Sequence, residues 1–159
     1  MIQLELKGGS FKHTPQLGLF HGLADQLDQK HPFYQLPNKI NWSFFEDAFK
    51  KHYSEKMGKP AKPIRLMASL LILKYVGNIS DENLMEQWSE NIYFQYFSGE
   101  QYFQANTPCV PTELGAFRQR TGEPGVELIL QERIRVNEPP EDNNTGIVVQ
   151  LFEGRIISL

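Results

Sequence analysis

Hydrophobic residues fill one segment of the chain almost without interruption, from Ile64 to Val76. Within these thirteen positions only Arg65, Ser69 and Lys74 are polar. A helix that is apolar on every face packs in the middle of a domain, because no side of it suits water. At this length the helix is about 20 Å long, and Gly77 is the expected left-handed stop. The pattern therefore predicts a central buried helix.

A second helix is predicted over residues 81–91, with Ser80 as its N-cap. Leu84 and Trp88 lie four residues apart on the inner face, and the same spacing on the opposite face gives an acidic stripe of Glu82, Glu86 and Glu90. Like charges at this spacing repel mildly, so the stripe is expected to face water. No histidine accompanies the carboxylates, so a metal site is not favoured there. An aromatic cluster follows, and Gly99 is expected to end this element.

The pattern is weaker in the N-terminal part of the chain. A short helix is predicted over residues 22–30, ended by His31-Pro32 because a residue before proline leaves the helical region. Ser43 and Glu46 fit a capping box at the start of a further helix. The interior of that helix carries an aromatic stripe at four-residue spacing: Phe45, Phe49 and Tyr53. Core packing accounts for the stripe.

Two shorter helices are predicted in the C-terminal part. Thr112 is expected to cap a helix that runs to Arg120, with Gln119 and Arg120 pointing outward. Arg118 falls beside the apolar stripe of this helix and is expected to pack or to form a pair. Residues 122–125 contain two glycines and a proline, which predict a break before a last helix over 126–136.

Together these elements predict an all-α fold, a small multi-helix domain around a central buried helix, in residues 1–137. After Asn137 the composition changes to a polar linker that leads to two strand-like runs, 147–152 and 155–159. The two residues between these runs are a hairpin signal. Residues 138–159 are therefore predicted to form a short C-terminal linker and a β-hairpin tail, separate from the helical domain.

The distribution of charge along the chain bears on function more than the overall composition does. The chain has 159 residues, 40% hydrophobic, and a formal net charge of -3, which argues against a dedicated nucleic-acid binder. The charges are nevertheless segregated: residues 50–65 carry six basic side chains against one acidic, and residues 81–113 carry six acidic side chains and no basic one. Such polarity is typical of a solvated surface, and less often of a docking face.

Several function classes lack their signatures. The sequence contains no glycine-rich phosphate loop, no HExxH and no Cys/His cluster at zinc spacing. The lone Cys109 excludes an intrachain disulfide, which points to a reducing cytoplasm, and a structural role is expected for it. No apolar run reaches the ~20 residues that a membrane span needs, and no signal pattern begins the chain. We therefore expect no catalytic site, no metal, no cofactor and no membrane partner.

Two surfaces of the predicted helices are candidates for contact with DNA. The tightest helix pair, 64–76 with 81–91, carries the acidic stripe, which would repel phosphates. The better candidate surface combines the basic segment 56–65 with the outward face of 112–120.

Several separate motifs resemble the N-terminal, InsH-like domain of bacterial insertion-sequence transposases of the DDE type. They are P-I-R-L-M-A-S-L-L-I-L-K at 63–74, G-x-x-S-D-E at 77–82, Y-F-Q-Y-F-S-G at 93–99, F-R-Q-R-T-G at 117–122 and G-V-E-L-I at 125–129. The resemblance covers roughly residues 10–137. It implies a helical domain that binds the terminal inverted repeats of the element, while a separate RNase H-like domain supplies three carboxylates for two divalent metals.

The chain departs from this family after Val136, where neither the basic linker nor a strand with an early aspartate follows. The first hypothesis is therefore a DNA-binding N-terminal fragment of a truncated transposase, not an enzyme by itself. Its phosphate contacts are assigned to Lys56, Lys59, Lys62 and Arg65, and its groove contacts to Gln119 and Arg120. The alternative is a helical interaction or dimerisation module without DNA affinity, which pairs with itself or with full-length transposase.

Overall fold

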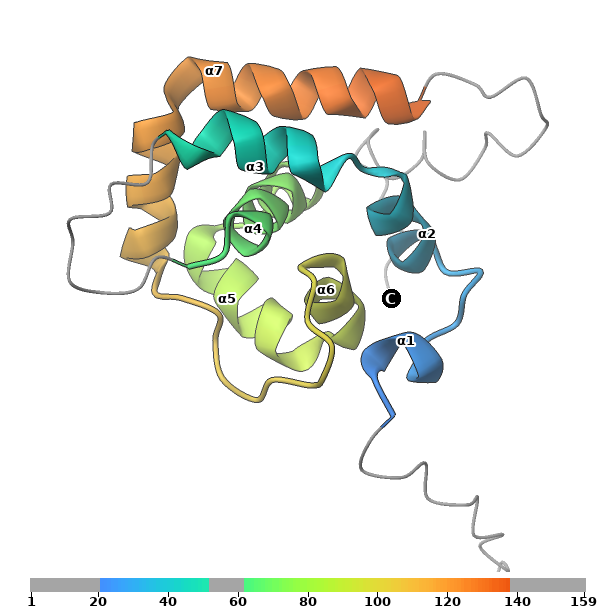
Figure 1. The fold of residues 1–159 in the computed structure, drawn as a ribbon. Coiled ribbons are helices and arrows are strands. Elements are labelled where there is room, and N and C mark those ends of the chain that lie inside the picture. Colours follow the sequence, from blue (N-terminus) through green and yellow to red (C-terminus); the bar gives the residue numbers. More distant parts are fainter. Residues whose placement is uncertain (1–20, 52–61, 138–159) are drawn as a thin grey trace, which may run out of the picture.

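The computed structural model describes residues 21–51 and 62–137, and in these residues every regular element is a helix (Figure 1). The helices are α1 (Leu23–Gln26), α2 (Pro32–Lys39), α3 (Trp42–Lys50), α4 (Ile64–Gly77), α5 (Asp81–Glu90), α6 (Ile92–Phe97) and α7 (Pro111–Asn137). The predicted all-α class is confirmed. The predicted hairpin tail and the end of the aromatic stripe at Tyr53 lie outside the described residues.

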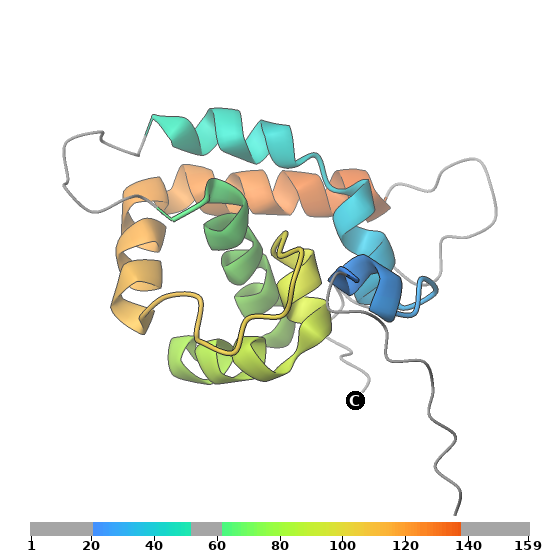
Figure 2. The same cartoon turned by 60° about the horizontal axis from the view of Figure 1, so that its bottom comes forward.

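Helix α4 is the centre of the molecule, as its sequence predicts. The other helices surround it in both Figure 1 and Figure 2, and α3, α5 and α7 all contact it. Even its polar Ser69 is fully buried, where the hydroxyl donates to the Leu66 carbonyl at 2.7 Å. The predicted stop is wrong by one residue: Gly77 still belongs to the helix, and Asn78 adopts the left-handed conformation at φ 47°. Asparagine tolerates that region better than most residues with a side chain.

Helix α5 begins at the predicted residue, and its apolar and acidic sides face the core and the solvent as predicted. The Ser80 hydroxyl accepts a hydrogen bond from the backbone N–H of Asn83 at 3.2 Å, Leu84 and Trp88 are buried, and the acidic stripe is exposed. The element does not continue to Gly99, however. The side chain of Asn91 accepts hydrogen bonds from the next two free N–H groups and so starts α6 as a new helix. The sequence pattern predicts one continuous element from residue 81 to residue 99. The N-cap at Asn91 divides it into two helices, α5 and α6.

Helix α2 is absent from the sequence prediction. The ring of His31 caps it, because Nδ1 accepts a hydrogen bond from the backbone N–H of Phe33 at 3.1 Å. Histidine is an uncommon N-cap and Pro37 lies inside the helix, so the local signals point the other way. Packing against α6 explains the helix. Aromatic pairs line this contact: His31 with Tyr93, Tyr34 with Tyr96, and Phe33 with Phe94.

Helix α3 begins earlier than the predicted capping box. Its N-cap is Asn41, whose side-chain oxygen accepts a hydrogen bond from the backbone N–H of Phe44. Ser43 therefore lies inside the first turn, one residue after Trp42. The predicted inward stripe is confirmed for Phe45 and Phe49, which are almost fully buried.

Helix α7 is bent at the predicted break and consists of two arms. Gly122 has φ 54° and ψ -155°, outside the helical region, yet the helix resumes at once after it. The first arm starts at Pro111, one residue before the predicted cap. There the Glu113 carboxylate accepts a hydrogen bond from the Val110 N–H at 3.1 Å, and Thr112 is exposed. Gly125 permits the tight bend, because a Cβ there would lie 2.6 Å from the Cβ of Thr121.

The second arm of α7 runs back along α3 (Figures 1 and 2). The buried Glu132 carboxylate accepts a hydrogen bond from the backbone N–H of Asn41 at 2.7 Å and pairs with Arg135. The Arg135 guanidinium also donates to the carbonyl of Lys39. These contacts fix the last described helix to the junction between α2 and α3. In the described ranges, no helix combines the length and apolarity that crossing a bilayer requires.

Candidate nucleic-acid interface

The structure separates basic side chains that hold the fold together from those that face solvent. Lys74 and Arg118 belong to the first group, since both pair with Asp81, at 2.6 Å and 3.4 Å. This triad ties α4, α5 and the first arm of α7 together. Burial acts to raise the pKa of Asp81, but the hydrogen bonds and charges of the two bases outweigh it, so the pKa lies below its usual value. The expectation that Arg118 packs or pairs is confirmed.

Arg120 belongs to the second group, and the neutral amide of Gln119 precedes it on the same arm. Both are exposed on the first arm of α7. Neither makes a hydrogen bond or ion pair with another described residue. The opposite side of the same arm is anchored in the core by Leu114 and Phe117, and the ring of Phe117 meets Phe49 edge-on at 5.5 Å. The arm therefore presents an amide and a guanidinium from a fixed backbone.

A shallow hollow of about 520 Å³ adjoins this face at the bend of α7. Its lining includes Gln119 and two partly exposed apolar side chains, Tyr75 and Leu130. Glu123 and Glu127 also line it, so the hollow is not uniformly basic. Arg118 also lines the hollow but pairs with Asp81, so the remaining positive charge of the candidate surface is that of Arg120 and of the segment that precedes α4.

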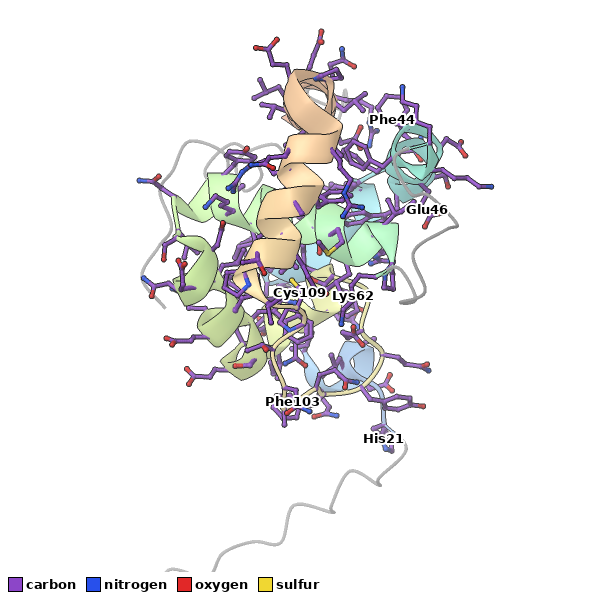
Figure 3. The ribbon with its side chains drawn as sticks, turned by 90° about the vertical axis from the view of Figure 1, so that its left-hand side faces the viewer. His21, Phe44, Glu46, Lys62, Phe103 and Cys109 are labelled. Atoms are coloured by element: carbon purple, nitrogen blue, oxygen red, sulfur yellow. The ribbon has the colours of Figure 1, made fainter. Side chains whose placement is uncertain are left out.

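Lys62 is the described part of that basic segment. It precedes α4, is partly exposed, and lies near Cys109 at the start of the first arm of α7 (Figure 3). Burial raises the pKa of the Cys109 thiol to about 11, with Glu113 acting the same way and Lys62 opposing them. The sulfur is buried and lies 3.6 Å from the sulfur of Met85, which suits the expected structural role. Lys56 and Lys59, also predicted to meet phosphates, lie outside the described residues.

Arg65 differs from the other predicted phosphate contacts. It is partly buried in the first turn of α4, with its guanidinium carbon 4.8 Å from the centre of the Trp42 ring. Sequence reasoning missed this contact, because an arginine and a tryptophan more than twenty positions apart share no periodic pattern. It also missed the buried Gln95, which appears in the sequence as one polar residue within an aromatic cluster.

Within the described ranges, no three His, Cys, Asp or Glu side chains gather closely enough to hold a metal ion. The three carboxylates of the acidic stripe on α5 are exposed. What the fold assembles is a helical domain whose helix α7 presents Gln119 and Arg120 to solvent.

This chain belongs to the family described as transposase domain (DUF772), whose model matches residues 21–120. It is also similar to the uncharacterized protein ORF8 in the nfe locus of Rhizobium meliloti, with 34% identity over 124 residues. That match covers 76% of this chain and 59% of the relative, so the chain spans about three-fifths of the relative's length. No solved structure matches the chain significantly. The resemblance to a transposase N-terminal region is thereby confirmed.

Proposed function

We propose that this chain is the DNA-binding part of a transposition system and that it contacts the terminal inverted repeats of its element. Membership of a transposase-domain family supports a role in transposition. The observation that carries the DNA-binding proposal is the exposed face of Gln119 and Arg120, which is rigidly held and committed to no described partner.

Each group on this surface has a chemical task in the proposal. Arginine donates two hydrogen bonds to a guanine edge, whereas a glutamine amide donates one hydrogen bond to an adenine edge and accepts one from it, so Gln119 and Arg120 are assigned to groove contacts. Lys56, Lys59 and Lys62 are assigned to phosphates, which position the domain without reading sequence. The chain itself is proposed to need no cofactor and to perform no strand transfer. That chemistry would come from a catalytic segment carrying carboxylates and metals.

The test is equilibrium binding of the whole chain to a duplex of the terminal repeat and to a scrambled duplex, at several salt concentrations. We expect tighter binding to the repeat, and log K falling with log salt by about 0.9 per phosphate contacted. Salt-independent binding, or no binding at all, would refute the proposal.

Arg120→Ala is the diagnostic variant. The loss of one groove contact is expected to weaken binding to the repeat by roughly tenfold to a hundredfold, and to weaken binding to the scrambled duplex much less. Lys30→Ala is the matched control, because it removes one exposed positive charge from the turn before α2. Equal losses in the two variants would show that only net charge matters.

A second candidate function is a protein-interaction module, favoured by a different face. Glu82, Glu86 and Glu90 form an exposed acidic stripe on α5. On the loop after α6, the side chains of Tyr102 and Phe103 are 47% and 54% exposed, and Figure 3 shows Phe103 pointing away from the body. Light scattering on the chain, alone and mixed with full-length transposase, distinguishes the candidates. A strict monomer that binds the repeat supports the first function over the second.

A further inference from the structure

Arg65 is held by three helical elements at once. Its backbone belongs to the first turn of α4, its guanidinium lies over the Trp42 ring at the start of α3, and its stem crosses Gly99 just after α6. An arginine on an aromatic face gains electrostatic attraction and loses freedom of movement. The side chain is therefore fixed in one orientation.

Gly99 makes this passage possible for two reasons. Its φ of +93° lies in a region that favours glycine, and a Cβ at this position would lie 2.8 Å from Nε of Arg65. A side chain here would strain the backbone and push the guanidinium aside. The sequence predicts Gly99 only as the end of a helix. In the structure it also leaves the space in which the Arg65 side chain lies.

No acidic residue of the described ranges forms an ion pair with Arg65. The charge of Glu46 acts on it, but neither Glu46 nor the phenol of Tyr96 forms a hydrogen bond with it. The Nε–H is completely buried and has no acceptor. Burial lowers the pKa of the guanidinium, so the fold bears a cost for holding this charge. The Arg65 side chain as a whole is only partly buried, so an anion would meet the terminal nitrogens of the guanidinium and not the buried Nε–H.

We propose that Arg65 is a preformed phosphate-contact residue of this domain, with Trp42 and Gly99 as its positioning residues, and that its anion is a backbone phosphate of DNA. This inference rests on the proposed DNA-binding function. A duplex is favoured over free phosphate because Lys62 lies three residues before Arg65, and a row of phosphates can meet both cations. Arginine suits the contact because its planar fork can donate two parallel hydrogen bonds to one phosphate.

The competing explanation is that Arg65 only fills space between α3, α4 and α6. The two roles separate in Arg65→Met, because methionine keeps much of the length and the apolar contact with Trp42 but carries no charge. Replacing a poorly compensated buried charge by an apolar side chain is often neutral or stabilising. We therefore expect the melting temperature of Arg65→Met to equal or exceed that of the wild type.

The decisive measurement is the salt dependence of repeat binding by wild-type protein, Arg65→Met and the control Lys30→Met. Arg65→Met is expected to bind more weakly at every salt concentration tested, with the slope of log K against log salt reduced by about 0.9, one phosphate contact. Lys30→Met should match the wild type. If Arg65→Met is folded and its affinity and slope are unchanged, this inference fails while the proposed function stands. If the wild type does not bind the repeat, the proposed function fails first.

A second measurement keeps the inference testable should Arg65→Met not fold. The ¹⁵N signal of the Arg65 Nε–H in the wild-type chain is followed during titration with the repeat duplex and, separately, with inorganic phosphate. We expect a shift on adding duplex and little change at the same concentration of inorganic phosphate. A signal that responds to neither overturns the inference, and one that responds only to inorganic phosphate overturns the assignment to DNA.

Discussion

His31 links local chemistry to the packing of α2. Its Nδ1 caps the helix, and its ring stacks on Tyr93 with the ring centres 3.8 Å apart. Burial lowers the pKa of the imidazole, and the charge of Asp28 opposes that shift. A protonated Nδ1 could no longer accept the hydrogen bond from Phe33, and its charge would be unfavourable at a helix N-terminus.

This arrangement predicts a pH dependence of stability. Because the pKa of His31 is lower in the folded state than the usual 6.5, the unfolded chain takes up the proton more readily. The contribution of His31 is fully present above pH 6.5 and is lost as the pH falls through the lowered folded-state pKa. Because the ring is only partly buried, we expect an effect of only a few tenths of a kcal/mol.

Urea unfolding at several pH values between 5 and 7.5 measures this effect, with His31→Asn as the control. Asparagine is a favourable N-cap without a charge change, so this variant should show a flatter profile over the same range. Identical profiles for the two proteins would contradict the assignment to His31. The pKa of Asp81 lies below its usual value because of its two basic partners, so this carboxyl stays outside the window.

At the scale of elements, Gln95 fastens the long loop after α6. Its side chain is fully buried and is bonded to Gln104 in both directions: Nε2 donates to the Gln104 carbonyl at 2.7 Å, and Oε1 accepts from the Gln104 N–H at 2.8 Å. The same amide nitrogen donates to the carbonyl of Trp88 in α5. The loop that carries Tyr102 and Phe103 is thereby held to both helices.

Replacing Gln95 by leucine should loosen this loop and destabilise the fold. The change leaves the backbone groups of Gln104 without their partner, for which we expect a loss of about 2–4 kcal/mol in the free energy of unfolding. Denaturant unfolding measures the loss, and hydrogen exchange at the Gln104 amide should become faster than in the wild type. Gln87→Leu on the exposed side of α5 is the matched control. A slow Gln104 amide in Gln95→Leu would count against the proposed fastening.

The same scale shows what the hydrophobic pattern could and could not predict. Helices α4 and α5 were predictable. A segment that is apolar on all sides must be buried, and a helix with one apolar face and one acidic face must turn the apolar face to the core. Helix α2 was not, since Pro37 and a histidine cap argue locally against it and its support comes from rings of α6. The separation of α5 from α6 was hidden for a similar reason: Asn91 acts through side-chain geometry.

At the scale of the whole molecule, Cys109 reports on opening of the core. It is the single cysteine of the chain and is buried at the start of the first arm of α7. Burial raises the pKa of its thiol to about 11, so very little thiolate is present near neutral pH. We predict that a thiol reagent at pH 8 labels the native protein only as fast as this arm detaches.

Labelling with a chromogenic disulfide measures that rate in rising concentrations of urea. The expected result is slow modification in buffer, faster modification below the unfolding midpoint, and immediate modification of the unfolded chain. Immediate stoichiometric labelling of the native protein would contradict the buried position. Asp81→Asn should accelerate labelling in buffer, because it weakens the triad that holds this arm.

The candidate interface was also predictable only in part. A helical wheel suffices to place Gln119 and Arg120 outward, because the apolar residues of that arm define its inner face. A basic side chain can instead be bound to another residue of the same chain, and that depends on contacts between segments far apart in the sequence. The pairing of Lys74 and Arg118 with Asp81, and the stacking of Arg65 on Trp42, both belong to this second kind of information.

The bend at Gly122 starts a second helical arm of known length and direction, which can serve as a reference for distance measurements. From the bend to Asn137 the second arm of α7 spans fifteen residues, about 22 Å along its axis, and it ends beside Lys39. A fluorophore at position 137 would thus lie at the far end of a stiff rod from Gln119 and Arg120. Energy transfer to dyes at either end of a bound duplex would then give the direction in which the DNA crosses the domain.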